Sequence, residues 1–87
     1  MATLNEKWAN AMHEWSTAKA RVKECRKAEH AAIRHYNQDY ELAIDTGGYA
    51  HLGRASRELA AAYDAKRAAE LQLDMVNGDL ILAEIGR

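Results

Sequence analysis

Residues 52–83, LGRASRELAAAYDAKRAAELQLDMVNGDLILA, decide the fold. Two interleaved series of residues, each with a period of seven, run through this stretch. The larger side chains belong to Leu52, Leu59, Lys66, Leu73 and Leu80. The smaller ones belong to Ala55, Ala62, Ala69, Val76 and Ala83. A seven-residue apolar repeat keeps one seam of a helix against a partner helix. The stretch therefore predicts a long helix, from about residue 51 to about residue 85, that packs on another helix.

The first half of the chain carries the same kind of repeat. Its larger members are Trp8, Trp15, Val22, Glu29, Tyr36 and Ala43. Its smaller members are Leu4, Ala11, Ala18, Cys25 and Ala32. Thr3 or Asn5 is suited to cap the start of such a helix, with Glu6 in the first turn facing the helix dipole. We predict this helix from about residue 3 to about residue 44.

Two glycine-containing sites bear on where the two predicted helices begin and end. Gly47 and Gly48 supply the left-handed conformation that commonly ends a helix, so we expect a loop at about residues 45–50. Asn77-Gly78 is typical of a turn. However, Leu73 before the pair and Leu80 after it keep the same phase. We therefore predict that the second helix continues through Asn77-Gly78.

The short loop predicts that the two helices are antiparallel neighbours. Centring the turn near Tyr49 sets most large seam residues opposite small ones, which lets the helix backbones approach closely. Glu29 and Lys66 then fall in adjacent layers, where their side chains are expected to meet. The prediction is an all-α fold, with one helical-hairpin domain over residues 1–87 that dimerises into a four-helix bundle.

Large apolar side chains exceed what one hairpin can cover, above all towards the end of the second helix. Exposed apolar surface of this kind favours association. Tyrosines near the loop add apolar ring surface together with a hydroxyl group that can form hydrogen bonds. The predicted partner-binding residues are Tyr40, Tyr49, Leu71, Met75, Ile81, Leu82 and Ile85. The surface either packs on a second copy of the chain or binds a different protein.

A basic run over residues 19–27 is the other candidate site. Lys19, Lys23, Arg26 and Lys27 are candidate contacts to a phosphate or to an acidic partner. The alternative is a solvated face balanced by acidic residues of the facing helix. The run has no aromatic residue for base stacking, its charges are expected to spread around the helix, and the net charge of the chain is −1. These features favour a protein partner over nucleic acid.

Catalytic and cofactor motifs are missing from the sequence. The four histidines form no metal-ligand spacing, and we find no CxxC, no HExxH and no phosphate-binding glycine loop. We therefore expect no enzyme activity, no metal and no cofactor. The single Cys25 reads as a buried small thiol. No apolar run is long enough for a membrane span, and no signal peptide is evident, so we expect a cytoplasmic protein without membrane contact.

These observations predict a non-enzymatic, homo-oligomeric module that binds a surface on another macromolecule. The alternation of large side chains with alanine is similar to that of small dimeric four-helix-bundle regulators, although no stretch of sequence matches one of them. Small helical chains of this size are common among phage and mobile-element accessory proteins, so an inhibitor or adaptor of a host macromolecule is the expected role. The second hypothesis is a nucleic-acid-associated protein that uses the basic run and Arg34.

Overall fold

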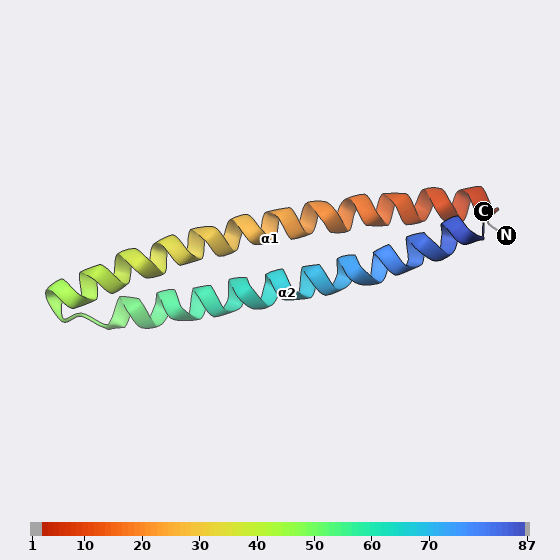
Figure 1. Cartoon of the computed structure of the whole chain (residues 1–87). Coiled ribbons are helices and arrows are strands. Elements are labelled where there is room, and N and C mark those ends of the chain that lie inside the picture. Colours follow the sequence, from red (N-terminus) through yellow and green to blue (C-terminus); the bar gives the residue numbers. More distant parts are fainter. Residues whose placement is uncertain (1–2, 87) are drawn as a thin grey trace.

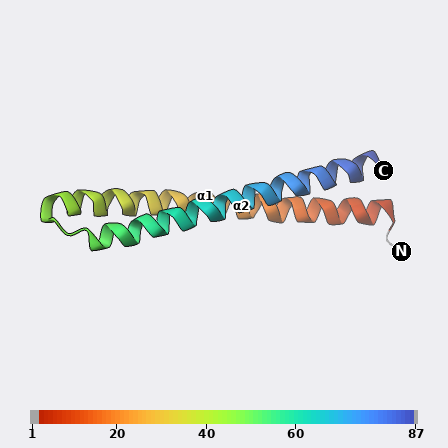
Figure 2. The same cartoon turned by 90° about the horizontal axis from the view of Figure 1, so that it is seen from below.

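The computed structural model describes residues 3–86, which form a rod of two helices (Figure 1). Helix α1 spans Leu4–Thr46, and helix α2 spans Ala50–Ile85. The rod measures 64 × 18 × 13 Å. The helices run antiparallel and cross near their middle, and both chain ends lie at the end opposite the turn (Figure 2). The predicted all-α helical hairpin is confirmed.

Helix α1 begins at a capping box. The Thr3 hydroxyl accepts a hydrogen bond from the Glu6 N–H at 3.1 Å, and the Glu6 carboxylate accepts one from the Thr3 N–H at 3.3 Å. These two bonds satisfy N–H groups that have no partner within the helix. Thr3, rather than Asn5, is therefore the N-cap.

The turn is shorter than the sequence predicted, because α1 continues to Thr46. The Thr46 hydroxyl donates to the Leu42 carbonyl at 2.7 Å, which keeps the last helical turn closed. Gly47 then ends the helix with a φ of 73°, and its N–H donates to the Ala43 carbonyl at 2.8 Å. Only residues 47–49 connect the two helices. The glycine-based helix end is confirmed.

Helix α2 is continuous through Asn77-Gly78, as the phase of the repeat predicted. A Cβ placed on Gly78 would have no atom within 4 Å apart from its own helix backbone. The glycine is therefore not required by the packing of the hairpin itself.

The core is a narrow seam between the helices. Its buried residues are Ala11, Ala18, Val22, Ala32, Ala43, Ala55, Ala69 and Val76. Half-buried side chains include those of Trp15, Cys25, Tyr36 and Leu73. Every residue of the two heptad series is buried or half-buried except Leu4, which is exposed in the first turn of α1. The pairing of individual large and small layers stays a prediction.

Neither helix can serve as a membrane span. Within residues 3–86, no helix combines the required length with sufficient apolar character.

Candidate interaction surfaces

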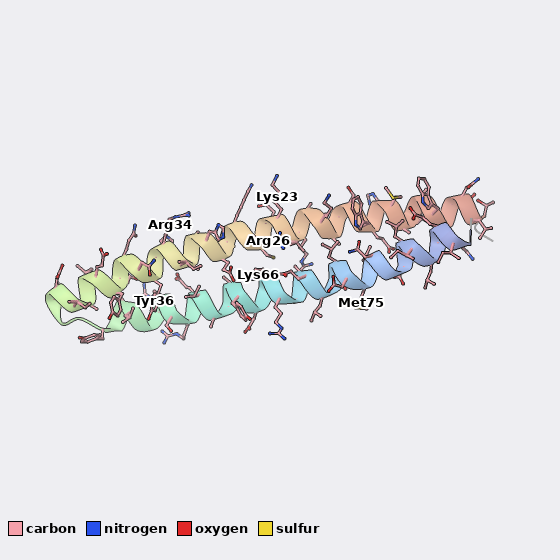
Figure 3. The ribbon with its side chains drawn as sticks, viewed as in Figure 1. Lys23, Arg26, Arg34, Tyr36, Lys66 and Met75 are labelled. Carbon is pink, nitrogen blue, oxygen red and sulfur yellow. The ribbon has the colours of Figure 1, made fainter. Side chains whose placement is uncertain are left out.

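An ion pair joins the two helices near the middle of the rod. Lys66 Nζ lies 2.8 Å from Glu29 Oε2, with 21% and 13% of the two side chains exposed. Both residues occupy seam positions, and Lys66 lies between the helices in Figure 3. The predicted meeting of these side chains is confirmed. Within residues 3–86 it is the only ion pair between α1 and α2.

The surroundings of Lys66 favour its charged form. The hydrogen bond to Glu29 raises the pKa of Lys66 above its ordinary value of 10.5, and partial burial, which lowers it, does not cancel this effect. The charges of Glu29 and Glu70 raise the pKa further. The Lys66 ammonium also lies 5.0 Å from the centre of the Tyr63 ring. The arrangement holds a paired positive and negative charge in the seam.

The side of α2 that faces away from α1 carries a stripe of large apolar residues. We call Leu71, Met75, Leu82 and Ile85 the outer stripe. Leu71 lies two positions from the seam residue Leu73, and two residues of an α-helix are about 200° apart around its axis. All four are well exposed, with 66% of Met75 and 69% of Leu82 accessible. Gly78 lies in the middle of this stripe, at the same helical spacing.

The other predicted partner-binding residues lie elsewhere. Ile81 is exposed on the flank of α2, and Tyr40 and Tyr49 are exposed near the turn. The Tyr40 ring stacks on Tyr36 with 6.3 Å between their centres and 22° between their planes. The structure therefore separates the seven predicted residues into the outer stripe, one flanking residue and a pair of tyrosines at the turn end.

Sequence reasoning missed two exposed apolar residues beside these tyrosines. Leu42 is 51% exposed and Ile44 is 61% exposed. Both flank Ala43, which is fully buried. That neighbourhood was the available signal, because residues next to a seam position are turned about 100° away from it and a single partner helix covers them at most partly.

The basic residues gather along one groove rather than spreading around α1. The groove has a volume of about 530 Å³ and is lined by Lys19, Val22, Lys23, Arg26, Lys27, His30 and Leu73. We call these residues the basic groove. The expectation that the charges spread around the helix is wrong for the four candidate residues, because the helical spacing of Lys19, Lys23, Arg26 and Lys27 brings them to one flank. Arg21 lies outside this groove, on a different hollow.

Three cations of the basic groove, Lys19, Lys23 and Arg26, form no ion pair within residues 3–86. Lys19 Nζ lies 4.5 Å from the centre of the Trp15 ring, and Lys27 pairs with Glu24 at 3.5 Å. Lys23 and Arg26, shown on α1 in Figure 3, form no ion pair with any residue from 3 to 86. The facing acidic residues thus lie beyond ion-pair distance of the groove. An anionic surface remains able to bind these two side chains.

Among residues 3–86, no group of three or more His, Cys, Asp and Glu side chains converges in a way that could hold a metal ion. Cys25 is a half-buried free thiol in the seam.

Comparison with known proteins adds no assignment: no family model, no curated protein and no solved structure matches this chain.

Proposed function

We propose that this chain is a non-enzymatic helical interaction module that binds a surface on another protein. The observation that carries the proposal is the outer stripe. Burying a Leu, Ile or Met side chain stabilises a protein by about 1.5–3 kcal/mol. The hairpin leaves four such residues exposed in one row on α2. A contiguous apolar row of this kind is typical of a protein-binding face.

The module acts as a homodimer, arranged as a four-helix bundle with alternating large and small layers. The thin seam supports this proposal, because its buried residues are alanine and valine alone. Small cores of this kind stabilise a chain weakly without further association. Light scattering tests the dimer. We expect at least twice the chain mass of 9.7 kDa at micromolar concentration, and a monomer at high concentration would contradict it.

The biological role that fits these features is that of a small inhibitor or adaptor of the type found in phages and mobile elements, acting in the cytoplasm. The cytoplasm is proposed because the chain has a single cysteine, which fits a reducing compartment.

A capture experiment tests the protein-binding role. The chain is immobilised and exposed to a lysate of its native host, and retained proteins are identified by mass spectrometry. The variant Met75→Glu/Leu82→Glu should lose the specific partner, because two carboxylates cannot be buried in an apolar contact. The matched control, Gln72→Glu, introduces a carboxylate at an exposed position outside the stripe and should retain the partner. Equal capture by all three chains would contradict the proposal.

Nucleic acid is the second candidate partner, because the basic groove gathers four cations and a histidine. Binding through phosphates would weaken steeply with salt, since each contact releases counterions. The test is a fluorescence-polarisation titration with single- and double-stranded oligonucleotides at about 100 mM salt. Sub-micromolar binding that disappears in Lys19→Ala/Lys23→Ala/Arg26→Ala/Lys27→Ala would favour this candidate over a protein partner.

A further inference from the structure

We infer that the basic groove is covered by α2 of a second copy of this chain, and that the two hairpins of the dimer have their turns at the same end. The inference rests on the proposed homodimer and adds its contact face and orientation. The observations that carry it are the position of the charges along the rod and the side on which they lie.

One face of the hairpin, which we call the groove face, contains the residues beside the seam on one side. On α1 they recur every seven residues as Met12, Lys19, Arg26, Ile33 and Tyr40. On α2 they recur as Tyr63, Glu70 and Asn77. Ile33 and Tyr63 line a common hollow, and Arg26 lines the basic groove with Leu73. The two flanks therefore open on the same side of the rod.

Opposite charges lie at the same level along the rod on this face. Leu73 marks the level of the basic groove on α2. Glu70, three residues earlier, shares its side of the helix, and Asp74 follows directly. The segment 68–86 contains four acidic residues and no Lys or Arg, although Asp79 lines a hollow on the other side of the rod. Lys66 and Arg67 lie at the turn-side end of the hollow that Glu70 and Asp74 line. A basic zone on α1 thus lies beside an acidic zone on α2, with Lys23 and Arg26 forming no ion pair within residues 3–86.

Two antiparallel bundles can be built by placing two groove faces together. With the turns at the same end, α1 of one copy lies over α2 of the other at the same level, and basic and acidic zones alternate around the bundle. With the turns at opposite ends and the rods fully overlapped, α1 lies over α1. The basic zone, which is near the middle of α1, then meets itself. Opposite charges on contacting helices attract and like charges repel. The arrangement with the turns at the same end is therefore favoured.

The uncharged residues of the groove face fit the same arrangement. Ile33 and Tyr63 are both exposed and lie at one level, since they share a hollow. With the turns at the same end, Ile33 of one copy packs on Tyr63 of the other, and this contact occurs twice. The outer stripe points away from both α1 chains and remains free for another partner.

Charge exchange between two variants tests the contact. Arg26→Glu sets a new carboxylate against Glu70 of the second copy, and Glu70→Lys sets a new ammonium against Arg26 of the second copy. Each variant alone should dimerise at least about tenfold more weakly than the natural chain. An equimolar mixture should recover dimers, because both contacts of the heterodimer then join a carboxylate to a cation. The repulsion inside each hairpin is unchanged by mixing, so recovery reports the contact between copies alone.

Spin labels test the orientation. A label is attached to Gly48→Cys in a Cys25→Ala background, since a Cβ at Gly48 meets only the Thr46 hydroxyl oxygen, at 3.4 Å. Neighbouring helices in a bundle pack about 8–10 Å apart, so we expect a label-to-label distance below about 30 Å. Turns at opposite ends would place the labels near the full rod length of 64 Å.

The matched control mixes chains labelled at Gly48→Cys with chains labelled at the exposed Glu84→Cys, near the other end of the rod. The two positions carry spectroscopically distinct labels and only the distance between unlike labels is read, so dimers of like-labelled chains do not contribute. Only opposite-end dimers then give a short distance. A short distance here, or no recovery on mixing the charge variants, would overturn the inferred arrangement and leave self-association standing. A monomer by light scattering would overturn the dimer itself. Oligonucleotide binding by the basic groove of an intact dimer would overturn its coverage by α2.

Discussion

Lys66 and Glu29 form the one ion pair that connects α1 to α2 within residues 3–86, with 2.8 Å between Nζ and Oε2. The two residues occupy positions that would otherwise hold apolar side chains. A charged side chain in the seam is stabilised only when the oppositely charged residue lies beside it on the other helix. The pair therefore favours one register of the hairpin over registers shifted by a heptad.

Removing one member of this pair should destabilise the hairpin more than removing both. Lys66→Met leaves the Glu29 carboxylate half-buried without its cation, and Glu29→Gln leaves the ammonium without its anion. The double variant has neither unpaired charge, and we expect it to be more stable than either single variant. Urea denaturation followed by circular dichroism measures the three midpoints.

The exposed Lys27–Glu24 pair is the control for that series. Glu24→Gln should change the free energy of unfolding by no more than about 0.5 kcal/mol, because exposed ion pairs contribute little. A double variant at Glu29 and Lys66 that is less stable than both single variants would contradict the register argument.

Alkaline pH should weaken the hairpin through Lys66. The pKa of Lys66 is raised in the folded chain above its ordinary value of 10.5, so the folded state holds this proton more tightly than the unfolded state. The stabilisation is complete below the unfolded pKa and is lost as pH rises through the raised folded pKa. The thermal unfolding midpoints of the natural chain and of Lys66→Met are measured from pH 9 to pH 12. The difference between the two midpoints should shrink towards the upper end of this pH range. A difference independent of pH would contradict this linkage.

Two glycine substitutions should change stability in opposite directions. Gly47→Ala places a side chain at a φ of 73° and should cost about 1–2 kcal/mol. Gly78→Ala adds a methyl group in open space within α2 and should stabilise the helix by about 1 kcal/mol. Both are read from urea midpoints at a concentration where the chain has one oligomeric state. Destabilisation by Gly78→Ala would indicate that another surface approaches α2 closely at this residue.

Charges on the outer stripe should leave the hairpin intact. Met75 and Leu82 are well exposed and lie outside the seam, so Met75→Glu/Leu82→Glu should change the free energy of unfolding by no more than about 1 kcal/mol. The helical signal in circular dichroism should be unchanged. A drop of several kcal/mol would show that the stripe is buried in the folded protein, and would identify it as part of the dimer contact in place of the groove face.

The seam of the hairpin could be predicted from the sequence because periodicity is a local property. The heptad phase shared by Leu73 and Leu80 was sufficient to predict that α2 continues through Asn77-Gly78. The heptad positions of Glu29 and Lys66 were sufficient to bring them together. Each of these predictions needs only the number of residues per turn and a short connection between the helices.

The helical spacing of the basic residues was enough to place them on one flank of α1, but the groove that they line with α2 could not be predicted in the same way. Whether Lys19, Lys23 and Arg26 line one groove depends on where Leu73 of α2 lies beside them, and so on the register and crossing of the two helices. The extension of α1 to Thr46 depends on one side-chain hydrogen bond to the Leu42 carbonyl. These features arise from three-dimensional packing, which propensity and periodicity do not determine.

Both ends of the chain lie at one end of the rod and the turn lies at the other (Figure 1), so the hairpin has the geometry of a spacer. Any domain or surface joined near Leu4 or Ile85 is held up to 64 Å from a molecule that contacts Tyr49 at the turn. Because each helix braces the other along its length, this separation varies less than it would across a flexible linker of equal length. The geometry would therefore fix the distance between two molecules that were attached at opposite ends of the rod.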